Sequence, residues 1–144
     1  MIPRYSRPEM TRLFAAETRL GIWLDVELAV AEAMAELGQI PAADIARLRA
    51  TAEAERQRIV DPVRVEAIEA VTRHDVIAFL THVEEICGAE ARFLHLGMTS
   101  SDLLDTTLAL QLKRAGAMLL DGVDAVLAAL RRRAFEHKRT PCIG

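Results

Sequence analysis

Aromatic residues are scarce in this chain of 144 residues: they make up 4% of it, with one tryptophan and one tyrosine. Hydrophobic residues nevertheless account for 51%, so the core must consist largely of leucine, alanine, valine and isoleucine. An aliphatic, alanine-rich core is typical of closely packed helices. No strand-like alternation and no internal repeat is sustained along the chain. The sequence therefore predicts an all-α fold.

An excess of positive charge is also lacking. The net charge is −3, which gives no electrostatic footprint for binding nucleic acid. The one basic cluster, Arg131 to Arg133, is expected near the end of a helix, where cations complement the helix dipole. A contact with a polyanion is the alternative interpretation of that cluster.

Cysteines number only two, Cys87 and Cys142, and they form no metal-ligand pattern. Nothing indicates a secreted protein stapled by disulfides. No apolar run approaches the roughly 20 residues of a membrane span, and no signal peptide is visible. Neither a glycine-rich phosphate loop nor a dinucleotide fingerprint occurs. We therefore expect a cytoplasmic protein without a metal or a cofactor, and with no membrane or nucleic-acid partner.

Apolar periodicity and capping residues predict six helices, at about 8–14, 16–37, 41–58, 63–71, 75–87 and 100–138. Residues 1 to 7 should be extended, because prolines bias the residues before them away from helix. We expect a helical domain over residues 1–98, followed over residues 99–144 by a turn and a long helix.

The last helix would be about 55 Å long, far beyond the average helix. Its apolar residues form two neighbouring stripes, which cover too much of its surface for a helix on one small domain. The simplest explanation is a helix of a bundle whose other members come from further sequence, from other subunits, or from both.

Three consecutive hydroxyl residues, Thr99, Ser100 and Ser101, stand at the start of that long helix. The first helical turn has free N–H donors and the positive end of the dipole, so hydroxyls there suit a carboxylate. The alternative is a helix cap, with Thr99 and Asp102 forming a capping box. Ser101 is a weaker binding candidate, because it could cap the helix instead.

Two further segments carry reactive or anion-binding side chains. His74 carries an imidazole, the side-chain type most often used as an acid or base near neutral pH, and Asp75 beside it could fix the tautomer or bind substrate. A plain helix entrance is the alternative. Arg4 and Tyr5 offer a rigid fork for phosphate and a flat ring face, although two such residues near a terminus could form only a surface contact. His95, just before the hydroxyl turn, is a weaker pocket candidate.

In chain order, these segments resemble three motifs of the adenylosuccinate lyase family, a branch of the aspartase/fumarase superfamily. Residues 4–10 resemble its nucleotide-binding segment, residues 72–79 its active-site histidine motif, and residues 99–106 its signature. The resemblance implies the elimination of fumarate from adenylosuccinate and from the succinyl-carboxamide ribotide of purine biosynthesis. It also implies a homotetramer whose active sites gather residues from several subunits.

The resemblance further assigns roles. His74 becomes the catalytic acid/base or orienting residue, and the substrate-binding residues are Arg4, Tyr5, Asp75, Thr99 and Ser100. The family's second histidine and its mobile serine loop would lie beyond residue 144, so we expect an N-terminal part that is inactive alone. Two alternatives remain: another superfamily lyase or a carboxymuconate cycloisomerase-like enzyme, and a non-catalytic helical interaction module.

Overall fold

The computed structural model describes residues 2–143, and helices connected by short turns dominate this part of the chain. In chain order the elements are η1 (Pro3–Tyr5), α1 (Pro8–Leu13), α2 (Ala16–Glu36), α3 (Ala42–Ala54), α4 (Arg56–Ile59), α5 (Pro62–Thr72), α6 (Asp75–Cys87), η2 (Gly88–Phe93) and α7 (Ser100–Glu136). No strand occurs within residues 2–143, and the predicted all-α fold is confirmed. Within the same residues, no helix combines the length and hydropathy that a bilayer crossing requires.

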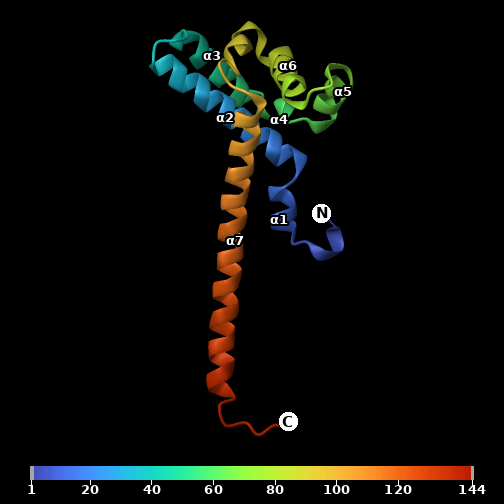
Figure 1. Ribbon diagram of the computed structural model, residues 1–144, viewed down its shortest axis with the longest axis vertical. Coiled ribbons are helices and arrows are strands. Elements are labelled where there is room, and N and C mark those ends of the chain that lie inside the picture. Colours follow the sequence, from blue (N-terminus) through green and yellow to red (C-terminus); the bar gives the residue numbers. More distant parts are fainter. Residues whose placement is uncertain (1, 144) are drawn as a thin grey trace.

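The molecule has a head and a stalk (Figure 1). Helices α2 to α6 gather in the head, and α7 runs out of it as one continuous helix of 37 residues. At 1.5 Å per residue α7 is about 55 Å long. Helix α1 lies against α7 below the head, where the Gln111 side-chain amide donates to the Leu13 carbonyl oxygen at 2.9 Å.

The core of the head joins α2 to α6. Trp23 meets Phe79 edge to face with ring centroids 5.5 Å apart, a favourable aromatic geometry, and both side chains are at most 1% exposed. Cys87 is also buried. Helix α2 buries an apolar stripe with helical spacing, Leu20, Leu24, Leu28 and Ala31. This packing fixes α6, and therefore the position of its N-terminus.

Two local predictions were wrong. Residues 1–7 are not extended throughout, because Pro3–Tyr5 forms a 3-10 turn in which the Tyr5 N–H donates to the Ile2 carbonyl oxygen at 3.0 Å. The helix expected over 41–58 is interrupted at Glu55, which has φ −103° and ψ 12°. Beyond this break, Arg56 reaches α2 and donates to the Gly21 carbonyl oxygen at 3.1 Å.

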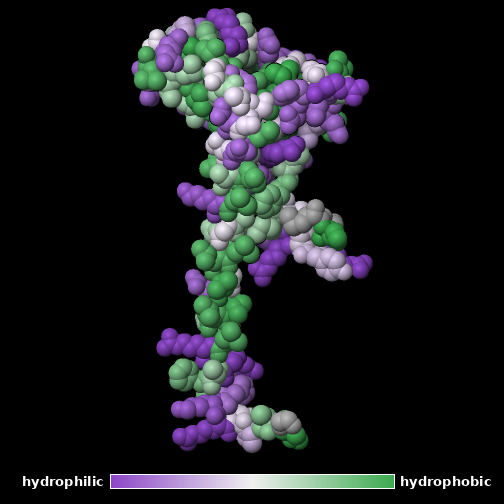
Figure 2. All heavy atoms as spheres, viewed as in Figure 1, coloured by the Kyte–Doolittle hydropathy of each residue, from purple (hydrophilic) through white to green (hydrophobic). Residues whose placement is uncertain are grey.

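The stalk leaves large apolar side chains exposed. Leu119 is 62% exposed and Leu127 is 57% exposed. Figure 2 shows hydrophobic residues along the middle of α7, and hydrophilic ones gathered near its C-terminal end. The apolar stripes expected on this helix therefore exist, and much of their length has no cover from residues 2–143.

Candidate active site

His74 is the N-cap of α6, in the turn that joins α5 to α6. Its Nδ1 accepts a hydrogen bond from the Ile77 N–H at 3.4 Å. A neutral imidazole with an accepting Nδ1 carries its proton on Nε2, so Nε2 is the donor that the ring offers outward. The side chain is 45% exposed, which leaves this donor accessible.

Arg73 lies in the turn between α5 and α6 that positions His74. It caps the C-terminus of α5 in the left-handed conformation, with φ 57°, a region that non-glycine residues rarely adopt. The Thr72 hydroxyl spans the same turn and donates to the His74 carbonyl oxygen at 3.2 Å. The turn therefore aims the imidazole, while Arg73 has a backbone role.

Thr99 and Ser100 lie at the N-terminus of α7. The Thr99 hydroxyl accepts from the Ser101 N–H at 3.1 Å, and the Asp102 carboxylate accepts from the Thr99 N–H at 2.8 Å. This is a complete capping box, and Thr99, not Ser101, provides the capping side chain. The cap and the carboxylate hypotheses are compatible, because a hydroxyl that accepts one hydrogen bond keeps its own proton to donate.

The histidine turn and the hydroxyl turn meet in space. The Ser100 hydroxyl oxygen lies 3.4 Å from Nε2 of His74, although 26 residues separate them in the chain. Each residue stands at the N-terminus of its helix, so the positive dipole ends of α6 and α7 lie close together. That arrangement favours an anion, and a carboxylate fits the donors offered by Ser100, Thr99 and His74.

Asp75 adds the negative group of this site. Its carboxylate accepts from the Val76 N–H at 2.8 Å and lies 3.6 Å from Nδ1 of His74. The side chain is 43% exposed. Because Nδ1 already accepts from the Ile77 N–H, the Asp75 carboxylate makes no hydrogen bond to this tautomer of the ring and has its free oxygen available for substrate.

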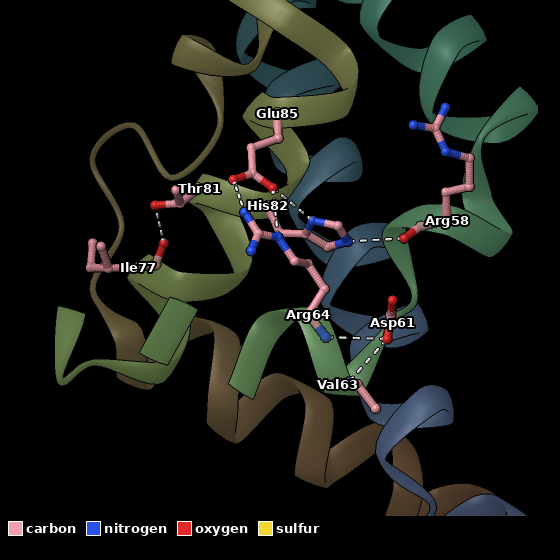
Figure 3. A network of polar contacts seen from close by, with 8 residues as sticks. All are labelled: Arg58, Asp61, Val63, Arg64, Ile77, Thr81, His82 and Glu85. Atoms are coloured by element: carbon pink, nitrogen blue, oxygen red, sulfur yellow. Dashed lines mark hydrogen bonds and ion pairs between the residues drawn. The ribbon is translucent and has the colours of Figure 1, made fainter. Parts of the chain in front are cut away.

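A polar network on the side of α6 supports the helix that carries His74 (Figure 3). The Glu85 carboxylate binds Arg64 of α5, and His82 approaches it at 3.4 Å. The other ring nitrogen of His82 lies 2.9 Å from the Arg58 carbonyl oxygen. Hydrogen bonds from Arg64 and then His82 hold the pKa of Glu85 below its usual range. His82 is buried between these two contacts, so its role is to pack the helices together.

Arg4 and Tyr5 lie apart from this site. They are exposed, and the segment that follows them lies along α7: Arg7, just before α1, and Met10 within it line a groove with residues 118–127 of α7. Met118 is eighteen residues beyond Ser100, or about 27 Å along the helix axis. Figure 1 shows the N-terminal segment beside the stalk, away from the start of α7. The structure thus brings His74, Asp75, Thr99 and Ser100 together, but not Arg4 and Tyr5 with them.

One buried pair was missed by the sequence reasoning. Glu27 on α2 is completely buried, and its carboxylate takes two hydrogen bonds from His95, just before the hydroxyl turn. The available signal was a lone acidic residue on the apolar stripe of α2, three positions after Leu24 and next to Leu28.

Known proteins resemble this chain over its whole length. A family model described as Lyase matches residues 4–144. Adenylosuccinate lyases from Synechocystis sp., Streptococcus mutans and Bacillus subtilis are 47%, 41% and 42% identical to it, over 100% of this chain and 32% of their own lengths. The chain thus spans about a third of these curated relatives.

A solved structure agrees with the fold. The fumarate lyase from Mesorhizobium sp. BNC1 superposes with a TM-score of 0.82 at 27% identity, covering 99% of this chain and 34% of the other. Because the family model matches nearly the whole chain and the solved lyase shares its all-α fold, the chain belongs to the lyase family.

Proposed function

We propose that this chain forms part of an adenylosuccinate lyase, which releases fumarate from adenylosuccinate and from the related succinyl-carboxamide ribotide in purine biosynthesis. The observation that carries the proposal is the contact between Ser100 and His74, where two helix N-termini offer a hydroxyl and an imidazole donor to one anion. The relatives named adenylosuccinate lyase support this substrate, because they align with every residue of the chain.

The proposed reaction is a β-elimination. A base removes a proton from the succinyl carbon next to one carboxylate, and the electron pair of that C–H bond forms the C=C bond of fumarate. The C–N bond breaks, its electron pair goes to nitrogen, and an acid protonates that nitrogen. Negative charge accumulates on the carboxylate beside the carbanion, so donors fixed near a succinyl carboxylate speed the reaction.

Each residue has a proposed role in this reaction. Ser100 and Thr99 donate to a succinyl carboxylate, and His74 contacts the same group through Nε2 as the acid/base or orienting residue. Asp75 accepts a hydrogen bond from the substrate. Arg4 and Tyr5 bind the nucleotide phosphate and base.

We further propose a homotetramer in the cytoplasm. The distance of η1 from Ser100 supports shared sites, since Arg4 and Tyr5 of one subunit would then complete a site on another. The exposed apolar residues of α7 supply the surface for such an assembly. In this proposal, residues 1–98 form the N-terminal domain and residues 99–144 begin the central bundle.

The test is an ultraviolet assay on the protein expressed from its complete reading frame, with adenylosuccinate and with other succinyl or carboxylated substrates. Appearance of AMP and fumarate supports the proposal. Cleavage of a different substrate alone indicates another lyase or a cycloisomerase of the superfamily, and no turnover of any substrate indicates a non-catalytic helical module.

A further inference from the structure

Glu27 is a fully buried acidic side chain, at 0% exposure, in the apolar face of α2. Burying a carboxylate is costly unless hydrogen bonds replace the water that it loses. Within residues 2–143 it pairs with neither lysine nor arginine, and both of its oxygens go to one residue. Oε2 accepts from the His95 N–H at 2.7 Å, and Oε1 lies 2.7 Å from the His95 Nδ1.

His95 has an unusual backbone. Its φ is 60°, in the left-handed region, which a residue with a side chain rarely adopts. It begins a tight turn in which its carbonyl oxygen accepts from the Met98 N–H at 3.3 Å, and Gly97 in the same turn has φ 73°. Thr99, the N-cap of α7, follows immediately. The two hydrogen bonds that His95 donates to Glu27 therefore fix the start of the loop that leads to Thr99 and Ser100.

The same contact sets the tautomer of His95. A carboxylate only accepts hydrogen bonds, so Nδ1 must carry a proton to donate to it. Nε2 lies on the opposite side of the ring and makes no hydrogen bond to any of the residues that the structure describes. The side chain is 16% exposed. Glu27 therefore holds the ring through Nδ1 and leaves Nε2 available to another group.

We infer that Glu27 is a positioning residue: it holds the backbone and ring of His95, and through them the hydroxyl turn, in the geometry that binds substrate. This inference rests on the proposed function. Partners that orient a histidine from behind are typically worth about 10- to 100-fold in activity in metalloenzymes, and the same orienting logic applies here.

The decisive substitution is Glu27→Gln, which preserves size but offers only one acceptor. If the amide oxygen keeps the His95 N–H, the amide NH₂ faces Nδ1, and the ring must move its proton to Nε2. Glu36→Gln is the matched control, because Glu36 is an exposed residue at the end of the same helix.

In the complete protein, Glu27→Gln should lower kcat/KM about 10- to 100-fold, while Glu36→Gln should stay near wild type. Folded Glu27→Gln protein with more than half of the wild-type kcat/KM would overturn the inference. A purely structural Glu27 would lower the folded fraction but not the kcat/KM of the protein that remains folded.

A second measurement decides the case in which Glu27→Gln fails to fold. Nitrogen NMR on the ¹⁵N-histidine-labelled chain, in mildly alkaline buffer, reports which ring nitrogen of each of its four histidines carries a proton. A proton on Nδ1 of His95 supports the inference, and an unprotonated Nδ1 overturns it. Absence of adenylosuccinate cleavage by the wild type would count against the proposed function, while the tautomer would still decide whether Glu27 holds His95.

Discussion

Replacing Ser100 with alanine should lower kcat/KM strongly while leaving the free energy of unfolding almost unchanged. Within residues 2–143 the side-chain hydroxyl contacts Nε2 of His74 at 3.4 Å, a long bond at an accessible site. Losing it should cost the free energy of unfolding less than about 0.5 kcal/mol. In the proposed complex the same hydroxyl binds a carboxylate, and a hydrogen bond to a charged group contributes about 1.5–3 kcal/mol. Since 1.4 kcal/mol is a factor of ten, kcat/KM should fall about 10- to 150-fold.

Thr99→Ala is the contrasting variant. It removes the cap that accepts from the Ser101 N–H, so it should lower the free energy of unfolding by about 1 kcal/mol. Urea unfolding and the cleavage assay on the complete protein measure the two effects separately. If Ser100→Ala retains more than half of the wild-type kcat/KM, or loses as much stability as Thr99→Ala, the assignment of Ser100 to substrate is refuted.

Three further predictions concern the rest of the structure. The pKa of Glu85 is lowered in the folded state, so its contribution to stability is present above its unfolded pKa and lost as pH falls through the folded value. The urea midpoint of Glu85→Gln should therefore change less at acidic pH than that of the wild type. Plots of urea midpoint against pH that run parallel for the two proteins would contradict this. The buried Thr107 hydroxyl has no hydrogen-bond partner among residues 2–143, so Thr107→Val should raise the free energy of unfolding by about 1 kcal/mol. A loss of stability would show that the hydroxyl is satisfied. Leu119→Gln with Leu127→Gln should weaken self-association in sedimentation experiments while changing intrinsic stability by no more than about 0.5 kcal/mol each, and unchanged association would remove these residues from the interface.

Helix positions followed from the sequence where local chemistry decides them. A helix was predicted from about residue 63, and α5 begins at Pro62, where the Asp61 carboxylate accepts from the Val63 and Arg64 N–H groups. The break at Glu55 could not be predicted in this way, because the residues around it favour helix. It accompanies the contacts of Arg56 with Gly21 and Asp25 on α2, which depend on how two distant helices pack.

In the candidate site, too, features set by neighbouring residues could be predicted, and features set by tertiary packing could not. The sequence indicated a capping box at Thr99 and a helix entrance at His74, because both depend on neighbouring residues. The contact between Ser100 and His74 depends on tertiary packing that brings the N-termini of α6 and α7 together, and only the family resemblance implied it. Glu27 escaped notice because its partner, His95, is 68 residues away in the chain.

The central claim is that His74 and Ser100 hold one substrate carboxylate together. A double-mutant cycle on kcat/KM tests it most directly, using His74→Gln, Ser100→Ala and both changes in the complete protein with adenylosuccinate. The proposed site predicts non-additive losses, with a coupling of at least about 0.5 kcal/mol between the two residues. Independent losses that simply multiply, or near-normal kinetics in all three variants, would contradict it.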